Sequence, residues 1–162
     1  NSTEILIFGQ LNQQKMNRKE VFDRPIMKKA MEILKLVDGL NAFLEKSEID
    51  ENSPLRFQLD MITENAMIIP AKISGAEAGD LYDIRMENAA IIRKAAREIS
   101  VTVGYLDLGR MEENDYTNLI RSEIENFKLL FREWVKSFDV WNYVVDDWGL
   151  FNPPGIEPEE EE

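Results

Sequence analysis

The sequence contains no cysteine and no histidine. Without cysteine, the chain cannot form disulfides, thiolate zinc sites or cysteine nucleophiles. Without histidine, it has no Ser-His-Asp triad, no imidazole acid–base group and none of the Glu-x-x-His ligands of metal-binding bundles. Nothing else in the sequence resembles an activated nucleophile or a tuned acid–base pair, so we predict that the protein is not an enzyme, and we expect no metal, no cofactor and no small-molecule substrate.

Long apolar runs are also missing, since no stretch approaches the roughly 20 residues of a membrane-spanning helix. The apolar residues near the N-terminus follow no basic region, which is not typical of a signal peptide. We expect a cytoplasmic protein that does not bind membranes. Its 162 residues are 44% hydrophobic and 31% charged, which fits one globular domain.

Negative charge is in excess but unevenly spread. The formal net charge is −12, and the last 24 residues hold eight acids and no base. Phosphate contacts depend on Lys and Arg, so an acidic chain is a poor candidate for nucleic-acid binding. That objection applies mostly to the C-terminal end, because the helical segments described next are close to neutral.

In three of four segments apolar residues recur at alternating spacings of four and three, and in the remaining one, residues 84–106, they form an apolar helical face of less regular spacing. Such patterns are typical of amphipathic helices and not of strands. Asp23, Ser53 and Asp80 are the expected N-caps of the first three helices, and Pro70 predicts a kink in the second. The expected apolar positions are Ile26, Ala30, Ile33, Val37, Leu40 and Leu44; Leu55, Leu59, Ile62, Ala66, Ile69 and Ile73; Ile84, Ile91, Ile92, Ala95, Ile99, Val103 and Leu106; and Ile120, Ile124, Phe127, Phe131, Trp134, Phe138, Trp141 and Val145.

These segments predict an all-α fold, an antiparallel up-and-down four-helix bundle over residues 24–151. Residues 1–23 form an N-terminal arm with a short apolar run at residues 5–8. Residues 152–162 are rich in proline and glutamate and predict a disordered acidic tail. This tail either keeps the protein soluble or lies over a basic face of the same molecule.

The second and third segments resemble the small four-helix-bundle family called 23S rRNA intervening-sequence proteins, which includes the accessory variability proteins of diversity-generating retroelements. The family pattern Ser-Ile-Pro-x-Asn-Ile-Ala-Glu-Gly corresponds to residues 68–76, where Ile69, Pro70 and Ile73 are shared and Lys72 and Gly75 replace the Asn and Glu. Further along, Glu98 and the Leu-Gly pair at residues 108–109 also fit. The resemblance implies a homo-oligomer, typically a pentamer, and a nucleic acid or a nucleic-acid enzyme as partner.

Basic residues gather along the third segment. Arg85, Arg93 and Arg97 lie on one helical row with a spacing of four residues, which Ala89 interrupts. Lys94 lies beside this row. They form a candidate face for nucleic acid or an acidic partner. The alternative is an ordinary solvated helix face, partly neutralised by nearby glutamates.

The fourth segment continues past the expected ends of the other helices and is rich in aromatic residues. Its first part, from Phe127 to Phe138, is expected to be core. The candidate oligomer or partner contacts follow it: Trp141, Tyr143, Val144, Trp148 and Phe151. The alternative is that residues 139–151 dock back on their own bundle.

Together these patterns predict a non-enzymatic, homo-oligomeric adaptor or scaffold that binds RNA, DNA or a nucleic-acid enzyme. The alternative is a purely protein-binding module that uses the aromatic C-terminal segment and has no affinity for nucleic acid.

Overall fold

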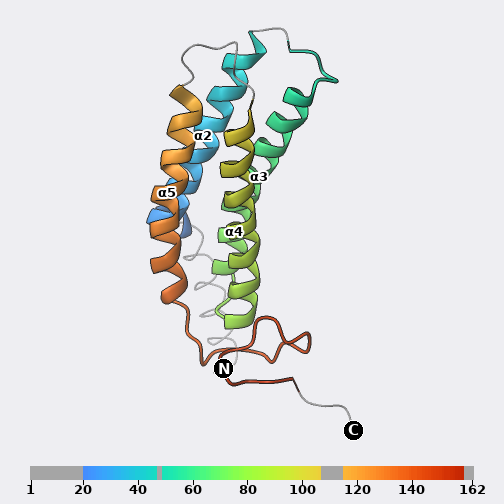
Figure 1. The fold of residues 1–162 in the computed structure, drawn as a ribbon. Coiled ribbons are helices and arrows are strands. Elements are labelled where there is room, and N and C mark those ends of the chain that lie inside the picture. Colours follow the sequence, from blue (N-terminus) through green and yellow to red (C-terminus); the bar gives the residue numbers. More distant parts are fainter. Residues whose placement is uncertain (1–19, 47–48, 107–114, 159–162) are drawn as a thin grey trace, which may run out of the picture.

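The structure is a computed structural model that describes residues 20–46, 49–106 and 115–158. In these ranges the chain has helices and no strand, which confirms the predicted all-α fold (Figure 1). The long helices are α2 (Pro25–Glu45), α3 (Pro54–Glu77), α4 (Tyr82–Tyr105) and α5 (Asp115–Lys136), and residues 20–23 form a helical turn before α2. Most of the predicted N-terminal arm, including its apolar run, lies outside the described residues.

Each long helix packs against two others: α2 against α3 and α5, and α4 against α3 and α5. The helices therefore close into a ring around one apolar core. Successive helices run in opposite directions in Figure 1. The link between α3 and α4 is short, which makes these two helices antiparallel neighbours.

The helix starts agree only in part with the predicted caps. The hydroxyl of Ser53 accepts a hydrogen bond from the Arg56 amide at 3.2 Å, which confirms this residue as the N-cap of α3. The predictions for Asp23 and Asp80 were wrong, because Arg24 caps α2 and Leu81 caps α4 without side-chain bonds. Pro25 and Pro54 occupy first-turn positions, where the missing N–H has no helical partner in any case.

The core follows the predicted apolar spacing closely in α2 and α3. All six predicted positions of α2 are buried, as are five of the six in α3; Leu55 is only partly buried. Helix α3 continues through Pro70 to Glu77. In α4 the pattern is shifted, because Ile84 is exposed and the neighbouring Arg85 takes the buried position.

Helices α2 and α5 approach closely at two levels. A Cβ atom on Gly39 would lie 2.7 Å from a ring carbon of Tyr116, so this contact depends on the absence of a side chain.

The Lys29 ammonium lies 2.5 Å from Glu123 and also contacts Glu32. Hydrogen bonds from Lys29, first to Glu123 and then to Glu32, raise the pKa of its ammonium group.

Helix α5 ends at Lys136, although the apolar spacing predicted a helix as far as Val145. The Ser137 hydroxyl donates to the Trp134 carbonyl at 2.6 Å, and the Asp139 carboxylate accepts from the Trp141 amide at 3.0 Å. Such local bonds from short polar side chains compete with helical hydrogen bonds. Phe138 still reaches the core, but Trp141 is 80% exposed and does not continue the buried row.

After α5 the chain forms an irregular C-terminal segment, residues 137–158, which folds beneath the start of α4 (Figure 1). The predicted disorder began at residue 152, yet the structure gives residues 152–158 defined contacts. Asn152 exchanges two hydrogen bonds with Asp146, and Pro153 is buried. The last four glutamates lie outside the described residues.

A buried carboxylate connects the beginning of α2 with the other three long helices. Glu77, near the end of α3, is 7% exposed. Its Oε2 lies 2.8 Å from an Arg24 guanidinium nitrogen, and its Oε1 lies 2.7 Å from one of Arg85. The Trp134 indole N–H donates to the same Oε1 at 2.6 Å. We call these four residues the Glu77 network.

Arg85 extends the Glu77 network toward the C-terminal segment. Its second terminal nitrogen lies 2.9 Å from an Asp80 oxygen, and its guanidinium carbon lies 4.3 Å from the centre of the Phe138 ring. The Phe138 and Trp134 rings meet edge to face, with centroids 4.8 Å apart. Among the described side chains, only Nε of Arg85 is a buried polar atom without a hydrogen bond.

We expect Glu77→Ala to lower the free energy of unfolding by about 3–5 kcal/mol, because it leaves the Arg85 charge buried without its nearest partner. Glu77→Gln should cost less, since an amide oxygen can still accept the Trp134 N–H. Urea unfolding followed by circular dichroism measures both losses. The control is Glu133→Ala, because among the described residues this exposed side chain pairs with Lys136 alone, and its loss should cost less than about 1 kcal/mol. Equal losses for Glu77→Ala and Glu133→Ala would contradict the proposed role of the network.

Candidate functional site

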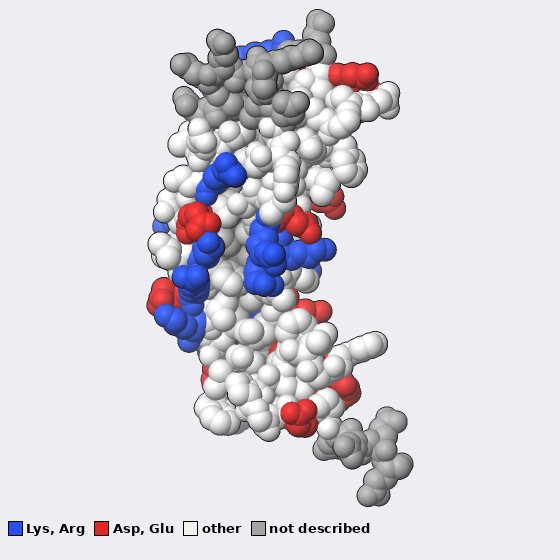
Figure 2. Space-filling model, viewed as in Figure 1, with Lys and Arg blue, Asp and Glu red and all other residues white. Residues whose placement is uncertain are grey.

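A groove lined by basic side chains runs between α4 and α5, with a cavity of about 480 Å³. Arg93 and Arg97 line it from α4, and Lys128 and Arg132 line it from α5. Figure 2 shows basic side chains gathered over the middle of the face that Figure 1 presents. We call this feature the α4–α5 groove.

The helical repeat explains why these four side chains meet. Arg93 and Arg97 are four residues apart, so they lie one above the other on α4. Lys128 and Arg132 have the same spacing on α5. Because α4 and α5 pack against each other, the two pairs form the opposite rims of one groove.

Between the basic rims the groove has an apolar floor. Ala96 contributes from α4, and Phe127 and Phe131 contribute from α5, with their ring centroids 6.2 Å apart. Phe127 is fully packed into the core, whereas Phe131 is only partly buried. The groove therefore offers positive charge at its edges and apolar side chains, chiefly the partly buried Phe131, between them.

Most of the positive charge in the groove is uncompensated. Lys128 pairs with Glu125 at 2.5 Å, and Glu125 is the only acid among the lining residues. Arg93, Arg97 and Arg132 have no ion pair with any residue that the structure describes. Their planar guanidinium groups are exposed, and each can donate two parallel hydrogen bonds to a phosphate or a carboxylate.

The structure brings together only part of the predicted basic face. Arg93 and Arg97 share the α4–α5 groove; Lys94 is exposed beside them, pairs with Glu98 at 3.7 Å and does not line it. Arg85 is 7% exposed and belongs to the Glu77 network. It cannot act as part of a surface face, because its guanidinium points into the molecule toward Glu77 and Phe138.

Sequence reasoning missed the α5 side of the groove. Lys128 and Arg132 were passed over because the aromatic spacing of α5 was interpreted only as core. A signal was present, since both basic pairs have the same spacing of four. Only the pairing of α4 with α5 shows that they face a common space.

The candidate contacts of the C-terminal segment have different environments. Trp141 is 80% exposed, Trp148 is 89% exposed, and Val144 is also exposed. Tyr143 and Phe151 are half-buried. The most exposed of these side chains are thus the two tryptophans.

The C-terminal segment nevertheless docks on its own α4. The Asn142 carbonyl accepts from the Tyr82 amide, and its side-chain amide donates to the Asp80 carbonyl, both at 2.7 Å. The Val144 amide donates to the Asp83 carboxylate at 3.1 Å. Docking therefore uses polar groups of the segment and leaves the indole rings at the surface.

Asp146 organises the turn that carries Trp148. Its carboxylate accepts backbone hydrogen bonds from Phe151 at 2.9 Å, Leu150 at 2.8 Å and Trp148 at 3.0 Å. These bonds, with the one from Phe151 contributing most, hold the pKa of Asp146 below its usual range. The ionised form of Asp146 therefore stabilises this turn.

Neither a metal site nor a membrane span is evident in the part of the chain that the structure describes. No group of acidic side chains there is arranged to hold a metal ion. None of the described helices is both long and apolar enough to cross a bilayer.

Comparison with known proteins gives no relative. No family model matches this sequence, and neither a curated protein nor a solved structure matches it. The resemblance to the 23S rRNA intervening-sequence proteins stays a prediction.

Acid should loosen the turn around Asp146. A lowered pKa means that the contribution of Asp146 is complete above the unfolded value, about 3.9, and is lost as the pH falls through the lower folded value. We therefore expect amide hydrogen-exchange protection of Trp148, Leu150 and Phe151 to fall below about pH 4. Asp146→Asn should reduce this protection already at pH 7. Asp147→Asn is the control, because this side chain accepts no hydrogen bond from a described residue, and an equal loss of protection in that variant would refute the assignment.

Proposed function

We propose that this chain is a non-enzymatic adaptor, built as an up-and-down four-helix bundle, whose α4–α5 groove binds the phosphate backbone of RNA. The observation that carries the proposal is the set of three exposed guanidinium groups, Arg93, Arg97 and Arg132, that form no ion pair with a described residue and lie on the rims of one groove. Arginine is suited to this task because its planar fork matches the geometry of a phosphate.

The apolar floor favours a nucleic acid over a simple anion. A guanidinium can stack on an unpaired base while its N–H groups contact phosphate, and single-stranded RNA offers both groups. The partly buried Phe131 gives the groove an aromatic edge between the basic rims. The residues shared with the 23S rRNA intervening-sequence proteins, Ile69, Pro70 and Ile73, favour the same class of partner.

The net charge of −12 repels RNA at long range, but the potential inside the groove depends mainly on the charged residues that line it. Four bases and one acid line the groove, and many of the acids lie in loops and at the C-terminal end. Charges beyond about 10 Å are largely screened at 0.1 M salt. We therefore expect modest affinity with a strong dependence on salt concentration.

The experiment is a fluorescence-anisotropy titration of a labelled RNA hairpin with the full chain at 50 and 150 mM salt. Arg97→Gln combined with Arg132→Gln should weaken binding at least about tenfold and reduce the salt slope by roughly 1 to 2, because two phosphate contacts are lost. Circular dichroism establishes that the variant is folded.

A control of equal charge change is Lys28→Gln combined with Lys35→Gln. Both side chains are exposed on α2 and neither lines the groove. This control should bind within about twofold of the unaltered protein. Equal weakening by both double variants, or no binding by the unaltered protein at 50 mM salt, would overturn the proposal.

A second candidate function is protein binding by the C-terminal segment, and the exposure of Trp141 and Trp148 favours it. Exposed tryptophans are enriched at protein interfaces. The predicted self-association belongs to this candidate, since a second copy is one such protein partner. Sedimentation analysis of the full chain and of Trp141→Ala tests self-association directly.

A further inference from the structure

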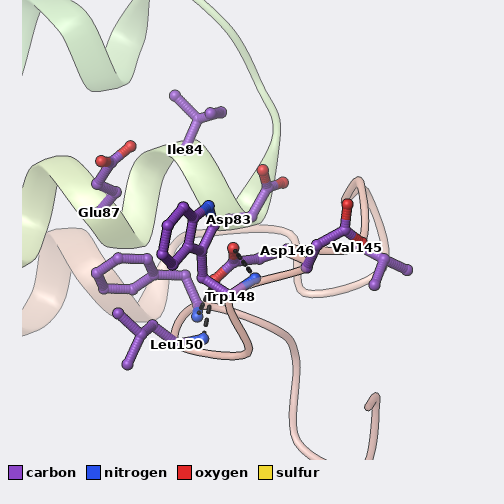
Figure 3. A pocket seen from close by; sticks show the side chains of 9 residues that line it. Asp83, Ile84, Glu87, Val145, Asp146, Trp148 and Leu150 are labelled. Carbon is purple, nitrogen blue, oxygen red and sulfur yellow. Dashed lines mark hydrogen bonds between the residues drawn. The ribbon is translucent and has the colours of Figure 1, made fainter. Parts of the chain in front are cut away.

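A second cavity, of about 530 Å³, lies between the first turns of α4 and the C-terminal segment (Figure 3). Helix α4 contributes Asp83, Ile84 and Glu87, and the rest of the lining comes from residues 145–151. None of the residues that form the α4–α5 groove lines it. We call it the acidic–aromatic pocket.

The wall contributed by the C-terminal segment is held in place before any ligand binds. The Asp146 carboxylate binds three backbone amides of the turn, as the dashed lines of Figure 3 show. The Val144 amide is fixed to Asp83, and Asn152 exchanges two hydrogen bonds with Asp146. A preorganised wall lowers the conformational cost of binding.

The charged residues that line the pocket are all acidic. Asp83, Glu87, Asp146 and Asp147 line it, and none of the described residues that line it is a lysine or an arginine. Asp83 and Asp146 accept backbone hydrogen bonds, whereas Glu87 and Asp147 are exposed and have no hydrogen bond or ion pair to a described residue. Two carboxylates are thus free to bind a cation.

Apolar side chains make up the rest of the pocket. Trp148 and Leu150 are among the most exposed apolar side chains described, and Ile84 is also exposed. Figure 3 shows Trp148 extending from the C-terminal segment on the α4 side of the pocket. An indole face attracts cations more strongly than the other aromatic rings do, and it most often pairs with arginine.

This combination selects a particular kind of ligand. A metal ion fits poorly, because no set of acidic groups in the described ranges is arranged to coordinate one. A guanidinium on an apolar stem fits well, because it stacks on an indole, donates paired hydrogen bonds to a carboxylate and carries methylene groups that cover apolar surface.

We infer that the acidic–aromatic pocket binds an arginine side chain of a basic peptide segment in a partner protein. The guanidinium stacks on Trp148 and pairs with Glu87 or Asp147. This inference rests on the second candidate function, protein binding by the C-terminal segment, and it is independent of the α4–α5 groove.

The test uses the full chain and two fluorescein-labelled peptides, hexa-arginine and hexa-citrulline, at 150 mM salt. Citrulline has nearly the shape of arginine without its charge. Anisotropy titrations should show binding of hexa-arginine and at least about tenfold weaker binding of hexa-citrulline, because the neutral side chain loses the ion pair and the cation–π contact. Equal affinity for both peptides would overturn the inference and indicate a groove for neutral partners.

Two double variants with the same change of charge distinguish binding in the pocket from non-specific attraction of hexa-arginine to an acidic protein. Glu87→Gln combined with Asp147→Asn should weaken hexa-arginine binding about tenfold. Asp38→Asn combined with Glu64→Gln makes the same change of charge at exposed positions on α2 and α3, and it should leave the affinity within about twofold. Equal weakening in the two double variants would overturn the inference.

Single aromatic substitutions provide a second test. Trp148→Ala should weaken hexa-arginine binding about tenfold, whereas Phe57→Ala removes an exposed aromatic ring on α3, outside the C-terminal segment and the pocket, and should have little effect. Both side chains are mostly exposed, so both variants should fold. An unchanged affinity in Trp148→Ala would refute the stacking contact. RNA affinity should be the same in Trp148→Ala as in the unaltered protein, so failure of this inference and failure of the RNA proposal are distinguishable.

Discussion

The carboxylate of Glu77 is the interaction on which the rest of the fold depends. It is buried, and its partners come from three other parts of the chain: Arg24 before α2, Arg85 on α4 and Trp134 on α5. Apolar burial is non-directional, whereas a buried carboxylate is satisfied only when its partners lie at hydrogen-bonding distance and angle. The Glu77 network thus supplies a reason for the four helices to adopt one register.

The Glu77 network also determines where the chain goes after α5. Arg85 lies over Phe138 and pairs with Asp80, so the residues just after α5 are held close to the start of α4. From there Asn142 reaches the Tyr82 amide and the Asp80 carbonyl. The acidic–aromatic pocket is therefore built on the same buried charges that align the helices, and its geometry depends on the core.

How well the sequence predicts this fold depends on whether the buried positions of each helix are apolar. In α2 the spacing of Ile26 to Leu44 identifies six of the seven buried positions, and the seventh, Met27, is apolar as well. In α4 the buried residues are Arg85, Ala89, Ile92, Ala95, Ala96, Ile99 and Val103. A hydrophobic pattern cannot find a buried arginine whose partner lies on another helix. For that reason Arg85 was placed on the surface and Ile84 in the core.

The same limit explains why only half of the α4–α5 groove was found. The spacing of Arg93 and Arg97 is visible within one helix, but their opposition to Lys128 and Arg132 arises only when α4 and α5 pack. The net charge of −12 taken alone argues against an anion site, but much of the excess negative charge lies at the C-terminal end. A ligand in direct contact responds first to the few charges that line its site, because more distant ones are screened. The net charge of −12 is therefore compatible with both proposed sites, one for phosphate in the α4–α5 groove and one for a guanidinium in the acidic–aromatic pocket.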